Sequence, residues 1–150
     1  MKTIVAFVDF SDTTEPVVAQ AQALAKAFQA RLILIHGVPL QPDMVDLGIV
    51  SPAYFRQPTA EEWSAHQAKL IALRDSLSAA GVDVTAEQFQ NLTLQKMLSE
   101  LGRLNVDLVI VGAHPHSVWY ELFIGSMTRD VLKYAPCPVL VVPAAKTSAS

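Results

Sequence analysis

Cysteine is nearly absent from this sequence, since Cys137 is the only one among its 150 residues. One thiol excludes disulfide bonds within the chain, and a cytoplasmic location is the simplest expectation. Apolar runs of the roughly eighteen residues that span a membrane are absent as well. Met1 and Lys2 lead directly into a strand pattern, which leaves no room for a signal peptide. We therefore expect a cytoplasmic protein without a membrane segment.

Positive charge is also scarce. The 11 Lys and Arg residues are outnumbered by 14 Asp and Glu residues, and they form no cluster. A mildly acidic chain of this kind is a poor candidate for binding nucleic acid. Apolar residues make up 51% of the sequence, which favours a packed core over disorder. We expect one domain over residues 1–143 and a flexible tail of small residues over 144–150.

Short apolar segments typical of buried strands alternate with segments that have helical spacing or helix caps. The expected strands are Ile4–Val8, Leu32–Ile35, Val82–Ala86, Leu108–Val111 and Pro138–Val142. The expected helices lie over 12–28, 59–81, 94–104 and 126–132, with Thr59 and Glu62 forming a capping box. This alternation predicts a doubly wound α/β sheet. Val82–Ala86 alternates in polarity, which predicts an edge strand.

Polar or glycine residues follow three of these strands: Asp9, His36-Gly37 and Gly112 to His114. In doubly wound sheets, ligands bind at the carboxyl ends of the strands where the winding reverses. We expect these residues to meet at one crevice. Gly112 is expected in a tight turn directly after its strand. Asp9 has two readings, as an acceptor for ribose hydroxyls or as the cap of the turn before the first helix.

Gly125 and Ser126 precede a short helix, so Ser126 is the expected N-cap. Free amides at such a helix start, together with the helix dipole, attract an anion such as phosphate. Spacing alone weighs this reading evenly against an ordinary capped connection. A Walker A loop, a Rossmann triple-glycine fingerprint and a Gly-x-Ser-x-Gly elbow are all absent.

Three histidines raise the question of metal or phosphate chemistry: His36, His114 and His116. Pro115 forces an extended backbone that separates the rings of its two neighbours, so a zinc site is disfavoured. Contact with phosphate oxygens and an exposed position without a role remain open. Residues 38–58 are rich in proline and also in apolar side chains, so they either pack over the sheet or gate a ligand.

Four stretches resemble the universal stress protein family: VAFVDFS at 5–11, LILIHG at 32–37, DLVIVGA at 107–113 and IGSMTRDVLKYAPCPVLVV at 124–142. The family's nucleotide motif is Gly, two residues, Gly, nine residues, Gly and then Ser or Thr. Gly112, Pro115, Gly125 and Ser126 keep every spacing of that motif. The resemblance runs along the whole chain. It implies a Rossmann-like, five-stranded parallel sheet with helices on both faces.

The resemblance also implies an adenine-nucleotide site for ATP, ADP or AMP, with or without Mg²⁺. Asp9 would bind the ribose and the Gly37 backbone the adenine. The full set of expected nucleotide-binding residues is Phe7, Val8, Asp9, Gly37, Val111, Gly112, His114, Gly125, Ser126, Met127 and Thr128.

Pro115 departs from the family, because the ATP-binding branch has its second motif glycine there. Proline removes an amide donor and fixes φ near −65°. Losing a hydrogen bond to phosphate costs about 1.5–3 kcal/mol, which is about one to two decades in affinity. We therefore expect a nucleotide site that is retained but weakened or altered in phosphate preference.

The last strand predicts a homodimer, as the resemblance also implies. Val139, Leu140, Val141 and Val142 would form an apolar edge that risks aggregation unless it is paired. Pairing with its copy across a two-fold axis removes that risk.

The expected function is a dimeric, nucleotide-sensing stress-response module without committed catalysis and with at most weak ATP hydrolysis. No general base, metal cage or nucleophile stands out. The alternative is a dimeric interaction protein of the family's non-binding branch. It would use residues 38–58 and the Trp119-Tyr120 surface for an unknown protein partner.

Overall fold

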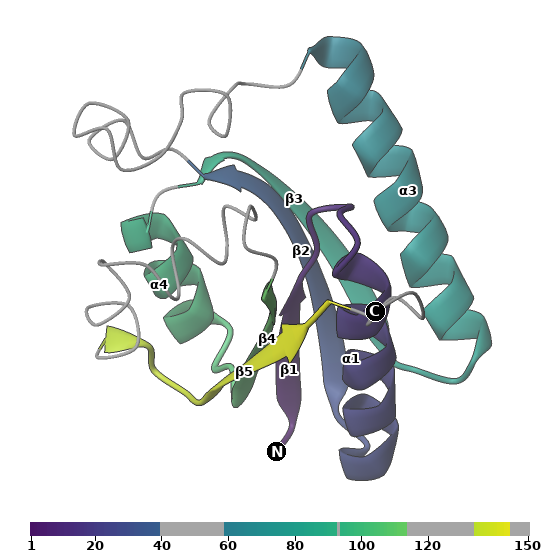
Figure 1. Cartoon of the computed structure of the whole chain (residues 1–150). Coiled ribbons are helices and arrows are strands. Elements are labelled where there is room, and N and C mark those ends of the chain that lie inside the picture. Colours follow the sequence, from purple (N-terminus) through teal and green to yellow (C-terminus); the bar gives the residue numbers. More distant parts are fainter. Residues whose placement is uncertain (40–58, 93, 114–133, 145–150) are drawn as a thin grey trace, which may run out of the picture.

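The chain folds into an open, five-stranded parallel sheet with helices on both faces (Figure 1). The computed structural model describes residues 1–39, 59–92, 94–113 and 134–144. Its strands are β1 (Thr3–Phe7), β2 (Arg31–Pro39), β3 (Val84–Leu92), β4 (Leu108–Ala113) and β5 (Val139–Pro143). Its helices are α1 (Thr14–Phe28), α3 (Ala60–Ala79) and α4 (Leu94–Arg103). The doubly wound α/β architecture predicted from the sequence is confirmed.

The strand order is β3-β2-β1-β4-β5, and all four pairings are parallel. The chain moves outward from β1 through β2 to β3, and then returns to place β4 on the other side of β1. The winding therefore reverses between β1 and β4, which is where this class of sheet binds its ligands. The carboxylate of Asp107 fixes the start of β1, because it accepts hydrogen bonds from the amides of Lys2 and Thr3 at 2.8 and 3.0 Å.

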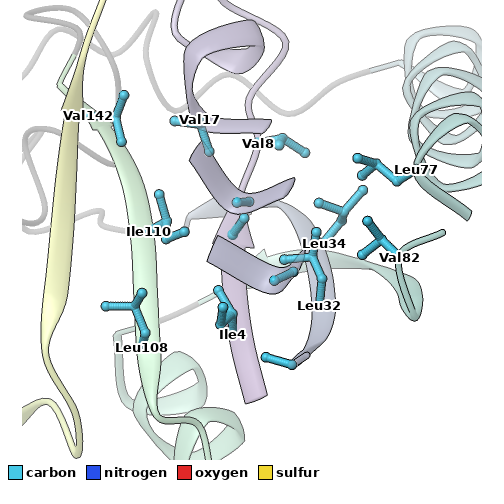
Figure 2. Packing of buried hydrophobic residues seen from close by; sticks show 14 of the residues in the cluster. Ile4, Val8, Val17, Leu32, Leu34, Leu77, Val82, Leu108, Ile110 and Val142 are labelled. Carbon is cyan, nitrogen blue, oxygen red and sulfur yellow. The ribbon is translucent and has the colours of Figure 1, made fainter. Parts of the chain in front are cut away.

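The main core lies between the sheet and the helices α1 and α3. Figure 2 shows this core, with Leu32 and Leu34 of β2 close to Leu77 of α3 and to Val82. These side chains are fully or almost fully buried. Successive strand residues point to opposite faces of the sheet, so every second residue of a strand enters this core. Burying each large aliphatic side chain stabilises the fold by about 1.5–3 kcal/mol.

A second core covers the opposite face, under α4. Val5, Phe7, Ile33 and Ile35 alternate with the residues of the main core and pack with Met97 and Leu101 of α4. Both faces of the central strands are thus covered, which explains why their sequences are continuous apolar runs rather than alternating ones.

Several boundaries differ from the prediction. β2 continues to Pro39, with a register shift between Gly37 and Pro39, and β3 begins at Val84 and extends to Leu92. The first helix begins at Thr14, two residues later than predicted, with Thr13 as N-cap and without a side-chain capping bond. The capping box of α3 is confirmed, because Thr59 and Glu62 each accept the other's backbone N–H.

Candidate functional site

Six of the expected nucleotide-binding residues lie within the described part of the chain, at the carboxyl ends of three adjacent strands. Phe7, Val8 and Asp9 end β1 and enter the following loop, Gly37 lies late in β2, and Val111 and Gly112 lie late in β4. The pairings of Phe7 with Ile35 and of Ala6 with Ile110 bring these three chain segments to one end of the sheet. The three strand ends thus lie side by side, and the crevice expected between them stays a prediction.

The apolar members of this set direct their side chains into the protein interior. Phe7 and Val111 belong to the core under α4, whereas Val8 belongs to the core under α1 and α3. All three are at most 3% exposed. Their side chains therefore hold the strand ends in place, and any contact they make with a ligand has to come from the backbone.

Asp9 organises the turn between β1 and α1. Its Oδ1 accepts hydrogen bonds from the backbone N–H and the hydroxyl of Ser11, at 3.0 and 2.6 Å, and from the Thr14 hydroxyl at 3.4 Å. The capping reading is thus correct for one carboxylate oxygen. The other oxygen makes no hydrogen bond within the described ranges, so the ribose reading is compatible with the same geometry. The turn orients the carboxylate before any ligand binds.

Thr13 connects this turn to β4. The Thr13 side chain is 2% exposed, and its hydroxyl lies 2.9 Å from that of Ser11. It packs so closely on Gly112 that a Cβ on the glycine would lie 2.5 Å from the Thr13 Cβ and closer still to the Oγ1. Gly112 lies inside β4, opposite Val142, and its φ is not positive. The predicted tight turn is therefore wrong, and close packing is the reason for a glycine here.

Phe10 has a left-handed backbone with φ of 60°. That conformation costs a non-glycine residue roughly 1–2 kcal/mol. Aromatic packing of the side chain offsets this cost, because the ring lies 4.9 Å from that of His36 and stacks on that of His66 at 5.3 Å. The ammonium of Lys69 lies 5.7 Å from the ring centre. Phe10 thereby holds the turn that carries Asp9.

His36 is an interior residue of β2, only 4% exposed. Its Nδ1 donates a hydrogen bond to the Val8 carbonyl at 2.9 Å. Burial is the main cause that lowers the pKa of His36 below its ordinary value, with a further lowering from His66. The exposed reading is thus wrong for this histidine. No cluster of three or more potential metal ligands occurs among the described residues.

The five remaining expected site residues lie outside the described ranges, as does Pro115: His114, Gly125, Ser126, Met127 and Thr128. The phosphate half of the site therefore stays a prediction. The same holds for His116, for Trp119 and Tyr120, and for residues 40–58.

Sequence reasoning did not assign Thr13, Phe10, Trp63 or His66 to this region. Phe10, Trp63 and His66 gather around His36 only because β2, α3 and the loop after β1 pack together. Thr13 instead meets Gly112 of β4. The one available signal was the helical spacing of Trp63 and His66, which places both on the same face of α3.

β5 forms one edge of the sheet, as predicted for the last strand. Val139, Leu140 and Val141 are partly exposed there, and Val142 is buried. The lone Cys137 precedes this strand and is half-buried, and burial together with the Asp107 carboxylate raises the pKa of its thiol. None of the helices in the described part is long and apolar enough to cross a membrane.

The sequence matches the model of the universal stress protein family over residues 1–143. A curated relative, the universal stress protein in the QAH/OAS sulfhydrylase 3′ region of Thermus aquaticus, is 31% identical over 144 residues. The match covers 94% of this chain and 98% of the relative. The chain belongs to the universal stress protein family.

Solved universal stress proteins share the fold described above. One, determined in complex with cAMP, has a TM-score of 0.64 at 22% identity, with 96% of this chain and 98% of that chain covered. Another, from Archaeoglobus fulgidus in complex with dAMP, has a TM-score of 0.62 at 16% identity, with 95% and 97% covered.

Proposed function

We propose that this universal stress protein binds an adenine nucleotide at the carboxyl ends of β1, β2 and β4. The observation that supports this most directly is Asp9, whose carboxylate is held by Ser11 and Thr14 at the point where the winding reverses. One of its oxygens makes no hydrogen bond to the described residues and is the proposed acceptor for the ribose hydroxyls. Relatives of the same fold have been solved with cAMP and dAMP bound.

Among the described residues, we assign some contacts with the nucleotide to side chains and others to the backbone. Asp9 binds the ribose through its side chain. Gly37 offers only backbone groups, and it lies where the register of β2 and β3 shifts before Pro39, so we assign the adenine edge to it. Phe7, Val8 and Val111 contribute through the backbone and through the packing that fixes it.

The phosphates would lie near Gly112 and the segment that follows β4. We assign them His114, Gly125, Ser126, Met127 and Thr128, because a Gly-Ser helix start provides amide donors for an anion. Pro115 removes one amide donor from this segment. The proposed consequence is a weaker preference for the triphosphate, so that ADP or AMP competes well with ATP, with or without Mg²⁺.

The protein is proposed to act in the cytoplasm as a regulatory stress-response module, with nucleotide occupancy rather than turnover as its output. The described side chains around Asp9 are hydroxyls and aromatic rings that hold the turn, which suits binding better than hydrolysis.

Isothermal titration calorimetry with ATP, ADP and AMP tests this proposal. We expect binding in the micromolar to sub-millimolar range and a loss of at least tenfold for Asp9→Ala, because the ribose contact is removed. Thr85→Ala is the matched control, since Thr85 is exposed on the edge strand β3 and should leave affinity unchanged. Absence of binding at millimolar nucleotide would contradict the proposal and favour an interaction protein of the non-binding branch.

Pro115→Gly tests the proposed effect of the motif substitution. Restoring the amide donor should strengthen ATP binding by about one to two decades, in line with the cost of a lost hydrogen bond to a charged group. The affinity for adenosine, which has no phosphate, should not change. Submicromolar binding of ATP by the wild-type protein would show that Pro115 does no harm.

A homodimer through β5 completes the proposal. The outer edge of β5 faces no other described strand, and three of its residues are partly exposed and apolar. Pairing this edge with that of a second copy satisfies its backbone groups and covers the apolar side chains.

A further inference from the structure

The buried imidazole of His36 meets the partly buried imidazole of His66 beside the proposed nucleotide site. The ring centres of His36, on β2, and His66, on α3, lie 4.9 Å apart with the rings nearly perpendicular. The Nε2 of His36 and the Nδ1 of His66 are buried and have no hydrogen-bond partner in the described structure. Buried polar atoms without partners are uncommon and require an explanation.

The hydrogen bond to Val8 fixes the tautomer of the neutral His36 ring. A carbonyl oxygen only accepts, so Nδ1 carries the proton, and the Nε2 of the neutral ring is a bare lone pair. Protonation would place a new N–H at Nε2, where the described structure offers it no partner, and a positive charge in a site that is 4% exposed. The neutral form is therefore the one that fits.

The hydrogen bond to the Val8 carbonyl favours protonation of His36, but burial opposes it more strongly. The rings of Phe10 and Trp63 pack against His36 at 4.9 and 6.0 Å. The nearest carboxylate influence comes from Asp9, which favours protonation of His36 less strongly than burial and His66 oppose it. β3 offers the neutral amide of Gln88, which is already directed at the Trp63 carbonyl at 3.3 Å.

Two further charged groups stand on the helices around Phe10. Lys69 of α3 lies with its ammonium over the Phe10 ring. Glu15 of α1 lines the same hollow of about 310 Å³ as Lys69, between α1 and α3. Among the described residues, Asp9 is thus the carboxylate that acts on His36, and Lys69 and Glu15 are the charged groups that line the hollow beside Phe10.

The pair is connected to the proposed site through the backbone on both sides. His36 binds the carbonyl of Val8, which directly precedes Asp9, and His36 itself directly precedes Gly37. Phe10, which packs on both imidazoles, directly follows Asp9 with its left-handed backbone. Any displacement of the rings therefore moves the residues assigned to ribose and adenine.

We propose that His36, packed against His66 and Phe10, is a positioning residue that holds Asp9 and Gly37 in place only while its ring is neutral, so that acid weakens nucleotide binding. The proposal rests on the nucleotide function proposed above and adds a proton-dependent control to it. His66 adds to burial in opposing the protonation of His36.

Calorimetry with cAMP between pH 7.5 and 5.5 tests the proposal, because the phosphodiester of cAMP does not titrate in this range. We expect the affinity of the wild-type protein to fall by about tenfold for each unit by which the pKa values of the free and bound states differ. An affinity that is constant across this range would overturn the proposal.

His36→Asn and His36→Leu separate positioning from simple packing. The asparagine amide can donate to the Val8 carbonyl from the position of Nδ1 but does not titrate. At pH 7.5 we expect it to bind cAMP more tightly than the leucine variant, and to show no acid-induced loss. The same acid-induced loss in His36→Asn as in the wild type would contradict a role for His36.

A ligand-free measurement tests the pair even if the protein binds no nucleotide. In a Trp119→Phe variant, Trp63 is the only tryptophan, and a protonated imidazole 6.0 Å away quenches its emission. We expect quenching on acidification with a midpoint below pH 6.5, and a higher midpoint in His66→Phe, where the like charge is removed. Unchanged emission from pH 8 to 5 would overturn the proposal, whereas absence of cAMP binding at pH 7.5 would contradict the nucleotide function alone.

Discussion

At the scale of single residues, close packing determines which side chains fit at the strand ends. Thr13 is buried against Gly112, and its hydroxyl continues through Ser11 to the Asp9 carboxylate. This contact joins β4 to the loop after β1, so the glycine is required for a reason that its place in a nucleotide motif does not reveal.

Gly112→Ala is expected to destabilise the protein by about 1–3 kcal/mol, the usual cost of overpacking a core. The added Cβ would overlap Thr13, which is buried and cannot move aside. Urea unfolding measures the change. Gly102→Ala in α4 is the control, because its Cβ meets nothing within 4 Å, and alanine should stabilise the helix by about 0.5–1 kcal/mol. Equal stability of Gly112→Ala and the wild type would contradict the packing account.

The buried His36 makes the free energy of unfolding depend on pH. Its pKa in the folded protein lies below the ordinary value of 6.5, so the unfolded chain binds the proton more readily. The contribution of His36 to stability is complete above pH 6.5 and is lost as the pH falls through the folded pKa. Urea unfolding of the wild type and of His36→Asn should show a smaller acid-induced loss in the variant. A larger loss in the variant would refute this assignment.

At the scale of elements, the strands were predictable and their polar extensions were not. Continuous apolar runs identify β1, β2 and β4, because these strands are covered on both faces. The later part of β3 contains Glu87, Gln88 and Gln90, and such polar residues form a strand only because they pair with β2. Pairing between distant segments leaves no local pattern in the sequence.

The N-terminus of α3 is stabilised by a capping box that the sequence did reveal. Thr59→Ala removes the acceptor for the Glu62 amide and should cost about 1 kcal/mol. Chemical denaturation checks this value. Ser64→Ala, at an exposed position within the same helix, is the control and should be neutral or slightly stabilising. A Thr59→Ala variant as stable as the control would show that the cap contributes nothing.

At the scale of the whole molecule, the sequence predicted which end of the sheet carries the proposed ligand site. It predicted only some of the residues that form this site. Asp9, Gly37 and Gly112 were predictable because each follows or ends an apolar strand. The aromatic cluster of Phe10, His36 and His66 was not, because its members come from a loop, a strand and a helix that meet only in the folded chain.

The outer edge of β5 is the expected interface of the proposed homodimer. Val141→Asp should weaken the proposed homodimer by at least tenfold, because the two-fold axis brings the new charges close together. Analytical ultracentrifugation at tens of micromolar measures the change. Ile71→Asp is the control, since Ile71 is exposed on α3, which is not part of this edge. A wild-type protein that is monomeric at this concentration would contradict the assembly.

The central claim is that an adenine nucleotide binds where β1, β2 and β4 end. An NMR titration of the ¹⁵N-labelled protein with AMP tests it most directly, because each backbone amide reports separately. The account predicts saturable shifts at Asp9, Gly37 and Gly112, while Gly81 at the opposite end of the sheet stays unchanged. Shifts confined to the hollow around Thr14 and Lys69, or none at millimolar AMP, would contradict it.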